Sequence, residues 1–292
     1  MLLDHSFITI QLLNALQLAS LLFLLSVGLS VVFGLMNFIN LAHGTLYMLG
    51  AYVGLSVARA TDSFWLALAL SPLAVAGVGA ALHVGLIGRL QRAAPMTQVL
   101  VTFGLIYVGL DAVRYVWGNY SYSIELPAAL AGSVEIAGET YPAYRLFLIG
   151  LGAAVLAALA LALERTRLGT VVRAGVDDRE TAMALGLNVD RAFFIAFCLG
   201  CGLAGLAGVA AAPVLSIYPG MDMSILILTL IVVVIGGPGS LAGAALGSLL
   251  VGMIETFGQA LAPEYASVVL YAAMAAILLL RPGGLAPARR PA

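Results

Sequence analysis

The stretch ITIQLLNALQLASLLFLLSVGLSVVFGLM, residues 8–36, decides the fold class of this chain. It contains no charged side chain. It is also longer than the roughly 20 apolar residues that an α-helix needs to cross the hydrocarbon core of a membrane. Residues 8–36 therefore predict a membrane-spanning helix.

Similar apolar runs follow along the whole sequence. Hydrophobic residues make up 62% of the chain, charged residues 9%, and the mean hydropathy is +1.08, values typical of a protein whose solvent is lipid. We expect an all-α polytopic membrane protein whose residues 1–292 form one transmembrane domain. The second, seventh and ninth candidate spans are short, so the prediction is eight or nine helices. The spans are 8–36, 44–58, 64–88, 97–117, 144–164, 191–212, 223–237, 240–260 and 266–280.

The arginines predict the orientation of the chain, because positive residues are retained on the cytoplasmic side. Three arginines, Arg59, Arg114 and Arg145, fall on one side of the predicted spans, and the other ten of the 13 fall on the opposite side. The N-terminus is then outside and the C-terminus inside. On the outer side, residues 118–143 alternate apolar and polar residues in short runs, which favours a β-hairpin cap over an irregular loop.

Several classes of function are disfavoured by composition. All basic residues are arginines, and a phosphate-binding P-loop needs a lysine, so the chain carries no ATP-binding motif of that kind. A net charge of −1 gives no reason to expect nucleic acid. Cys198 and Cys201 lie in an apolar run and are expected to be small buried hydrophobes, and the three histidines are scattered. We expect no metal, no cofactor and no catalytic residues.

Two breaks interrupt the helical pattern, GLMNFINLAHG at residues 34–44 and IGGPGSLAG at residues 235–243. Each stands before a helix rich in small residues, which suggests a weak internal repeat. Irregular backbone at membrane depth occurs where it is buried in protein or lines a wet cavity. Asn37, Asn40, His43 and Gly44 are therefore candidates for a translocation pathway. The alternative is a plain turn in which an asparagine caps the next helix.

Small residues recur at helical spacing in two spans, and such rows allow helices to approach closely in lipid. One row is Gly239, Gly243 and Gly247, and the other contains Gly200 and Gly208. They predict either packing within a many-helix bundle or a subunit interface.

Residues 165–191 are the most polar loop, with five arginines and four acids. Acids at 177, 178 and 180 precede apolar residues at 182, 183, 185 and 187, with Gly186 as a break. This pattern predicts a short amphipathic helix on the membrane surface.

The segment RLGTVVRAGVDDRETAMALGLNVDR resembles the cytoplasmic coupling loop in permeases of branched-chain amino acid ABC importers, the Liv-type high-affinity family. NFINLAHG, IGGPGSLAGAALGSLLVGMIE and LLLRPGGL are similar to further landmarks of that family, in the same order along the chain.

The resemblance implies a transport subunit in the bacterial inner membrane that moves branched-chain or other hydrophobic amino acids. Its partners would be a second related permease, two cytoplasmic ATP-hydrolysing subunits and a periplasmic binding protein. The residues implied in ATPase coupling are Glu180, Met183, Leu185, Gly186, Leu187, Asp190 and Arg191.

Three alternatives remain open from sequence. The cargo of a related importer could be urea or a short-chain amide. An ion-coupled secondary transporter would more often carry acids across the membrane. An intramembrane enzyme would need a nucleophile paired with a base.

Overall fold

The computed structural model describes residues 5–36, 40–90 and 93–286, most of which are helical. Each of the nine predicted spans corresponds to a helix. They are α1 His5–Met36, α2 His43–Thr61, α3 Phe64–Leu82, α5 Pro95–Trp117, α6 Ala143–Arg165, α9 Val189–Ala211, α10 Met221–Gly236, α11 Leu241–Leu261 and α12 Ala266–Leu280. Within the described residues, seven helical segments are long and apolar enough to cross a membrane, and α10 is a shorter apolar helix. The predicted all-α polytopic membrane fold is confirmed.

Local sequence signals set many of the helix ends. The side chains of Ser63, Asn188 and Ser240 accept hydrogen bonds from the first-turn amides of α3, α9 and α11. Pro95 occupies the first turn of α5, where its missing N–H costs nothing. α3 continues without a break through a π-helical turn, His83–Ile87, into the short α4, Gly88–Leu90.

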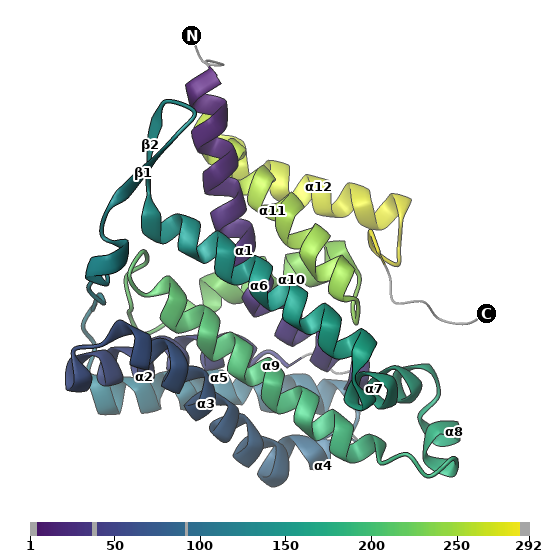
Figure 1. Ribbon diagram of the computed structural model, residues 1–292. Helices are drawn as coiled ribbons and strands as arrows, with labels where there is room; N and C mark the ends of the chain where they lie inside the picture. Colours follow the sequence, from purple (N-terminus) through teal and green to yellow (C-terminus); the bar gives the residue numbers. More distant parts are fainter. Residues whose placement is uncertain (1–4, 37–39, 91–92, 287–292) are drawn as a thin grey trace.

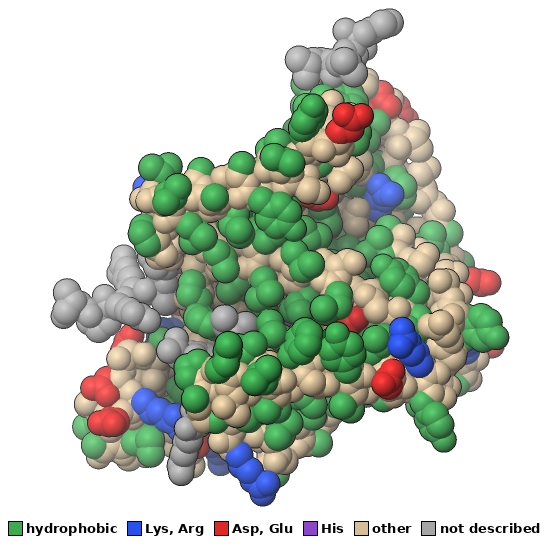
Figure 2. All heavy atoms as spheres, turned by 180° about the vertical axis from the view of Figure 1, so that it is seen from behind, with side chains coloured by type: hydrophobic (Ala, Val, Ile, Leu, Met, Phe, Trp, Pro, Cys, Tyr) green, Lys and Arg blue, Asp and Glu red, His purple; other side chains and the backbone are tan. Residues whose placement is uncertain are grey.

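The long helix α1 lies at the centre of the bundle and packs against α6, α9, α10 and α11. In its apolar segment 72% of the residues are buried, against 11% in α6 and in α12, so α1 is central and the other two are peripheral. Figure 1 shows α2, α3 and α5 on one side of the molecule and α11 and α12 on the other, with α6 and α9 crossing between them. Figure 2 shows hydrophobic side chains over much of the opposite face, as expected for a surface in contact with lipid.

The hairpin predicted within residues 118–143 is present and confirmed. Strands β1, Ser133–Ile136, and β2, Glu139–Pro142, pair antiparallel, with Val134 opposite Tyr141. Ala137 and Gly138 connect them with φ values of 52° and 85°, the paired positive angles of a tight hairpin turn. The short 3₁₀ turn Ala128–Leu130 precedes the hairpin. Figure 1 shows the hairpin near the first turns of α1, and we call this the hairpin end of the molecule.

The segment after α12 folds back onto the C-terminal end of α10. The amides of Leu285 and Ala286 donate to the carbonyl oxygens of Ile235 and Gly236, at 2.8 and 3.0 Å. These bonds satisfy carbonyl groups that the end of a helix would otherwise leave without a partner. A 3₁₀ turn, Pro263–Tyr265, links α11 to α12.

Candidate functional site

The loop between α6 and α9 forms two helices of its own. α7 covers Arg167–Asp177 and α8 covers Arg179–Ala184, and Figure 1 shows both at the end of the molecule opposite the hairpin. The sequence predicted one helix near residues 177–187, so α7 was missed and α8 is shorter than expected. The division occurs at Asp178, whose backbone is extended with φ −152° and whose side chain caps α8.

The Asp178 cap is tight. Its Oδ1 accepts the amide of Thr181 at 3.0 Å, and its Oδ2 accepts the Thr181 hydroxyl at 2.6 Å. These two bonds, the hydroxyl bond first, hold the pKa of the Asp178 carboxyl below its usual value. The cap is therefore ionised at neutral pH, and negative charge at a helix N-terminus is stabilising.

α7 is anchored to the end of α6. Thr166 accepts the amide of Gly169 at 3.2 Å, and Gly169 lies so close to the Leu163 carbonyl that no larger residue fits there. The Arg173 guanidinium donates to the same Leu163 oxygen. Val172 is buried in an apolar cluster with Phe193 of α9. α7 is thus fixed to both helices that flank the loop.

α8 ends in a Schellman motif at Gly186. The amide of Gly186 donates to the Met183 carbonyl at 3.0 Å, and the amide of Leu187 donates to the Ala182 carbonyl at 3.1 Å. Gly186 has φ +83°, the left-handed angle that this motif needs. Ala182 points inward and is 3% exposed, whereas Met183 and Leu185 are 48% and 77% exposed. The motif therefore presents two apolar side chains on a polar end of the molecule.

The charged candidates of this loop divide into two groups. Asp190 pairs with Arg179 at 2.5 Å, a contact between α8 and the first turn of α9 that is partly exposed. The guanidinium of Arg179 also lies 5.7 Å from the ring centre of Phe193. Glu180 and Arg191 are exposed, and no ion pair involves either of them within the described residues. The surface that α8 offers consists of Met183, Leu185 and Glu180, with Arg191 nearby in sequence.

The pathway candidates lie in a buried polar centre where α1, α2 and α10 meet. Asn40 accepts the amide of Ala42 at 3.2 Å, and the Nε2–H of His43 donates to the Leu25 carbonyl of α1 at 3.1 Å. Leu25 precedes the end of α1 by 11 residues, so α2 begins about 16 Å back along that helix. The start of α2 is therefore inside the bundle. Asn37 lies outside the described residues.

A carboxylate that the sequence analysis did not single out completes this polar centre. Asp222, in the first turn of α10, is 1% exposed, and its Oδ2 accepts the Thr45 hydroxyl at 3.1 Å. A Cβ atom on Gly44 would lie 2.8 Å from the Asp222 carbonyl oxygen, so only glycine allows α2 and α10 to meet here. The signal in the sequence was an acid between apolar segments, but its partner is 177 residues away.

The glycine candidates take two different positions. A Cβ on Gly200 would lie 3.0 Å from the Gly28 carbonyl oxygen, and Gly208 meets the Tyr47 carbonyl, so both lie where α9 crosses another helix. Gly243 and Gly247 lie against α10, next to Gly236 and the Val232 carbonyl. Gly239 lies in close contact with Gly34 of α1 but is not part of a helix. It precedes α11, has φ +76°, and donates its amide to Ser30 at 3.1 Å, so it belongs to the turn between α10 and α11.

The remaining His, Cys, Asp and Glu side chains of the described residues form no metal-binding cluster. Among the described residues, no three His, Cys, Asp or Glu side chains are arranged to hold a metal ion. Cys198 and Cys201 are both free thiols, and Cys201 is fully buried within α9.

The chain also matches known proteins. A family described as "Branched-chain amino acid transport system / permease component" matches residues 11–278. The chain belongs to this permease family. The match includes the buried polar centre and the whole α7–α8 loop.

Individual relatives in this permease family are similar over nearly their full length. The high-affinity branched-chain amino acid transport system permease protein LivH of Escherichia coli K12 is 30% identical, over 94% of each chain. LivH of Salmonella typhimurium LT2 is 29% identical and BraD of Pseudomonas aeruginosa 28% identical, again over 94% of each chain. No solved structure matches the chain.

Proposed function

We propose that this chain is the membrane-spanning subunit of an ATP-driven importer for branched-chain or other hydrophobic amino acids. It would work with a second related permease, two ATP-hydrolysing subunits and a binding protein that delivers the solute. Family membership and the names of the relatives support the substrate class. One observation supports the coupling to ATP-hydrolysing subunits. Met183 and Leu185, at the end of α8, are exposed apolar side chains that are not buried against the described chain.

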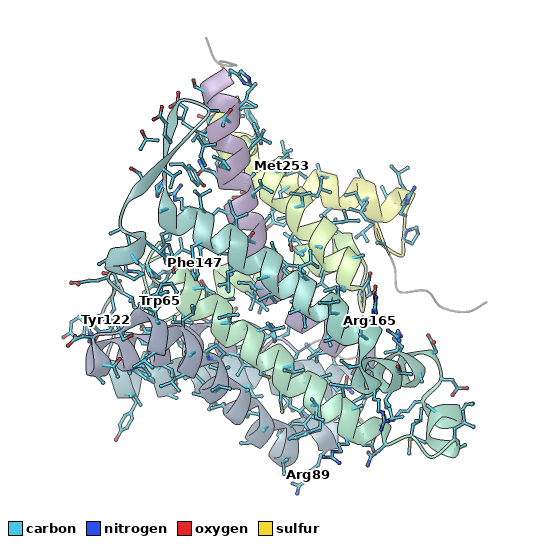
Figure 3. The ribbon with its side chains drawn as sticks, in the orientation of Figure 1. Trp65, Arg89, Tyr122, Phe147, Arg165 and Met253 are labelled. Atoms are coloured by element: carbon cyan, nitrogen blue, oxygen red, sulfur yellow. The ribbon has the colours of Figure 1, made fainter. Side chains whose placement is uncertain are left out.

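The α7–α8 end is the side that we assign to the cytoplasm. Figure 3 shows Arg89 and Arg165 toward this end, whereas Trp65 and Tyr122 lie toward the hairpin end. All five arginines of the α7–α8 loop and its flanks are on this side, in keeping with the retention of positive residues. The N-terminus would then be outside and the C-terminus inside.

Met183 and Leu185 would insert into an apolar groove on an ATPase subunit, with Glu180 and Arg191 setting the register by paired charge. Two contacts support the transmission of movement. α7 is bound to the end of α6 through Leu163, and α8 is bound to the start of α9 through Arg179. A displacement of α8 would therefore act on two spanning helices together.

We assign the pathway gate to the polar centre around Asn40, His43 and Gly44. The residues are buried in this conformation, and hydrogen bonds from His43 and Thr45 join α2 to α1 and α10 beside the apolar core. A tilt of α9, which packs against α1, α2 and α3, would change these contacts first.

Purification of the importer from its native membrane in mild detergent tests the proposal, with identification of every chain that co-purifies. Leu185→Asp is expected to lose the ATPase subunits and ATP-driven leucine uptake. Leu215→Asp is the matched control, because Leu215 is 46% exposed in the loop after α9, away from α8. Normal ATPase recovery and uptake with Leu185→Asp would exclude α8 as the coupling element.

A further inference from the structure

A hollow of about 400 Å³ lies at the hairpin end of the molecule. It is formed by the last turns of α2, the start of α3 and residues 123–125. Its volume is within the range of roughly 300–1,000 Å³ that is common for small-molecule pockets. Neither the hollow nor its residues belong to the α7–α8 surface or to the buried polar centre.

The floor of the hollow is apolar. Leu55 of α2, Phe64 of α3 and Ile124 of the loop line it, and each is at most 6% exposed. Phe64 is held by an edge-on contact with the Tyr144 ring at 5.8 Å. These side chains come from three segments and are fixed by the core, and each exposes only a small apolar area to the hollow, so the floor offers a shallow contact to an apolar group.

The rim of the hollow carries both signs of charge. Arg59, Asp62 and Glu125 all line it and are exposed. Within the described part of the chain, no ion pair joins the arginine to either acid. Unpaired charges of opposite sign around one hollow are free to bind a ligand that carries both a positive and a negative charge.

The Arg59 side chain is held in place by the Tyr122 ring. Its guanidinium lies 4.6 Å from the ring centre of Tyr122. Tyr122 in turn donates its hydroxyl to the Trp117 carbonyl at 2.6 Å, and its backbone pairs with that of Ile217 through two bonds of 2.8 Å. Figure 3 shows Tyr122 at this end of the molecule. Arg59 is therefore pre-organised, which lowers the entropy cost of binding a carboxylate.

Asp62 is placed at the rim by the end of α2. It is the C-cap of α2 and has φ +49°, a left-handed angle that ends many helices and that Asp tolerates better than most side chains. This turn places the carboxylate at the rim of the hollow, between α2 and α3.

We propose that this hollow binds an apolar α-amino acid as a zwitterion before it enters the permease. Arg59 binds the carboxylate, Asp62 and Glu125 bind the ammonium group, and Leu55, Phe64 and Ile124 contact the side chain. The inference rests on the proposed function, since it names a receiving site for the same solute on the outer side. A neutral solute such as an amide would form no ion pair with the guanidinium or the acids.

Protection of an introduced thiol tests the site. The assembled permease complex, with its ATPases and without the binding protein, carries Ser123→Cys at the edge of the hollow and reacts with a small charged thiol reagent. Leucine is expected to slow this reaction. 4-Methylpentanoate lacks the ammonium group and 3-methylbutylamine lacks the carboxylate, and neither should protect at the same concentration. The complex without Ser123→Cys supplies the background from Cys198 and Cys201.

Variants identify the groups that bind. Arg59→Gln is expected to weaken protection by leucine about tenfold or more, because one charge-assisted hydrogen bond is lost. Arg145→Gln is the matched control, since Arg145 lies at the same end but donates to Asn14 and does not line the hollow. Equal effects of the two variants, or no protection by leucine, would overturn the site.

Two further outcomes also contradict the proposal. Protection that appears only when the binding protein is added would mean that the hollow docks that protein. Equal protection by all three compounds would mean nonspecific filling of the apolar floor. The proposed function is tested separately, because ATP-driven leucine uptake by the unmodified complex is measured without the labelling experiment.

Discussion

Replacing Gly186 tests whether the end of α8 must be rigid for an ATPase to bind. Gly186 has φ +83°, and a Cβ atom added there would meet nothing within 4 Å. A substitution therefore adds no clash with neighbouring side chains. Its whole cost is backbone strain, about 1–2 kcal/mol for an L-residue in the left-handed region.

That cost acts on the Schellman motif that positions Met183 and Leu185. A penalty of about 1–2 kcal/mol lowers the ratio of formed to unformed motif roughly 5- to 30-fold. If the ATPase binds only the formed motif, its apparent dissociation constant can rise by at most that factor. Gly186→Ala should weaken binding by no more than this factor, and Gly186→Val should weaken it more than Gly186→Ala, because a β-branched residue tolerates positive φ least.

The assay is titration of detergent-solubilised permease with the ATPase subunit that co-purifies with it. Gly186→Asn is the matched control, since asparagine adopts the left-handed region more readily than other side chains. Membrane insertion should be unchanged, because the motif lies outside the spanning helices. Wild-type affinity for Gly186→Val, or equal weakening by the Asn and Val variants, would refute the reasoning.

Two other predictions concern the bundle itself. Thr45→Val removes the hydroxyl that donates to the buried Asp222, and thermal unfolding should show a free energy of unfolding lower by about 1–3 kcal/mol. The control, Thr229→Val, removes only a hydrogen bond to its own helix and should lower the free energy of unfolding less. Equal losses in the two variants would contradict a special role for the Thr45–Asp222 pair. Gly28→Ala would place a Cβ atom 2.6 Å from the Gly200 carbonyl oxygen and should destabilise the protein by about 1–3 kcal/mol. The control, Gly77→Ala, adds a Cβ atom with nothing within 4 Å and should be neutral or stabilising. Unchanged stability of Gly28→Ala would show that α1 and α9 can separate without cost.

The loop between α6 and α9 shows where local reading succeeds and where it stops. The apolar residues at 182, 183, 185 and 187 and the break at Gly186 correctly indicated a short helix with a defined end. The same reading missed α7, although its sequence is strongly amphipathic and carried a local signal for a helix. What the sequence could not show is that its apolar face packs against Leu163 of α6 and Phe193 of α9.

The glycines show the same limit. Their spacing indicated faces suited to close approach, and Gly200, Gly208, Gly243 and Gly247 do lie at helix crossings. The partner of each glycine could not be read from spacing, because many rows in a membrane bundle contain small residues. Gly239 fits the spacing and yet lies in a turn, since Ser240 caps α11 one residue later.

The sequence by itself determined the membrane fold, the positions of the apolar helices and the hairpin between α5 and α6. In lipid each helix must satisfy its own backbone hydrogen bonds over about 20 apolar residues, and such a run can be recognised within one segment of the sequence. Only the tertiary structure decided that α2 begins inside the bundle, that Thr45 meets Asp222, and that Arg59, Asp62 and Glu125 surround one hollow. These contacts join residues distant in sequence, and they depend on how the helices cross, which no local pattern encodes.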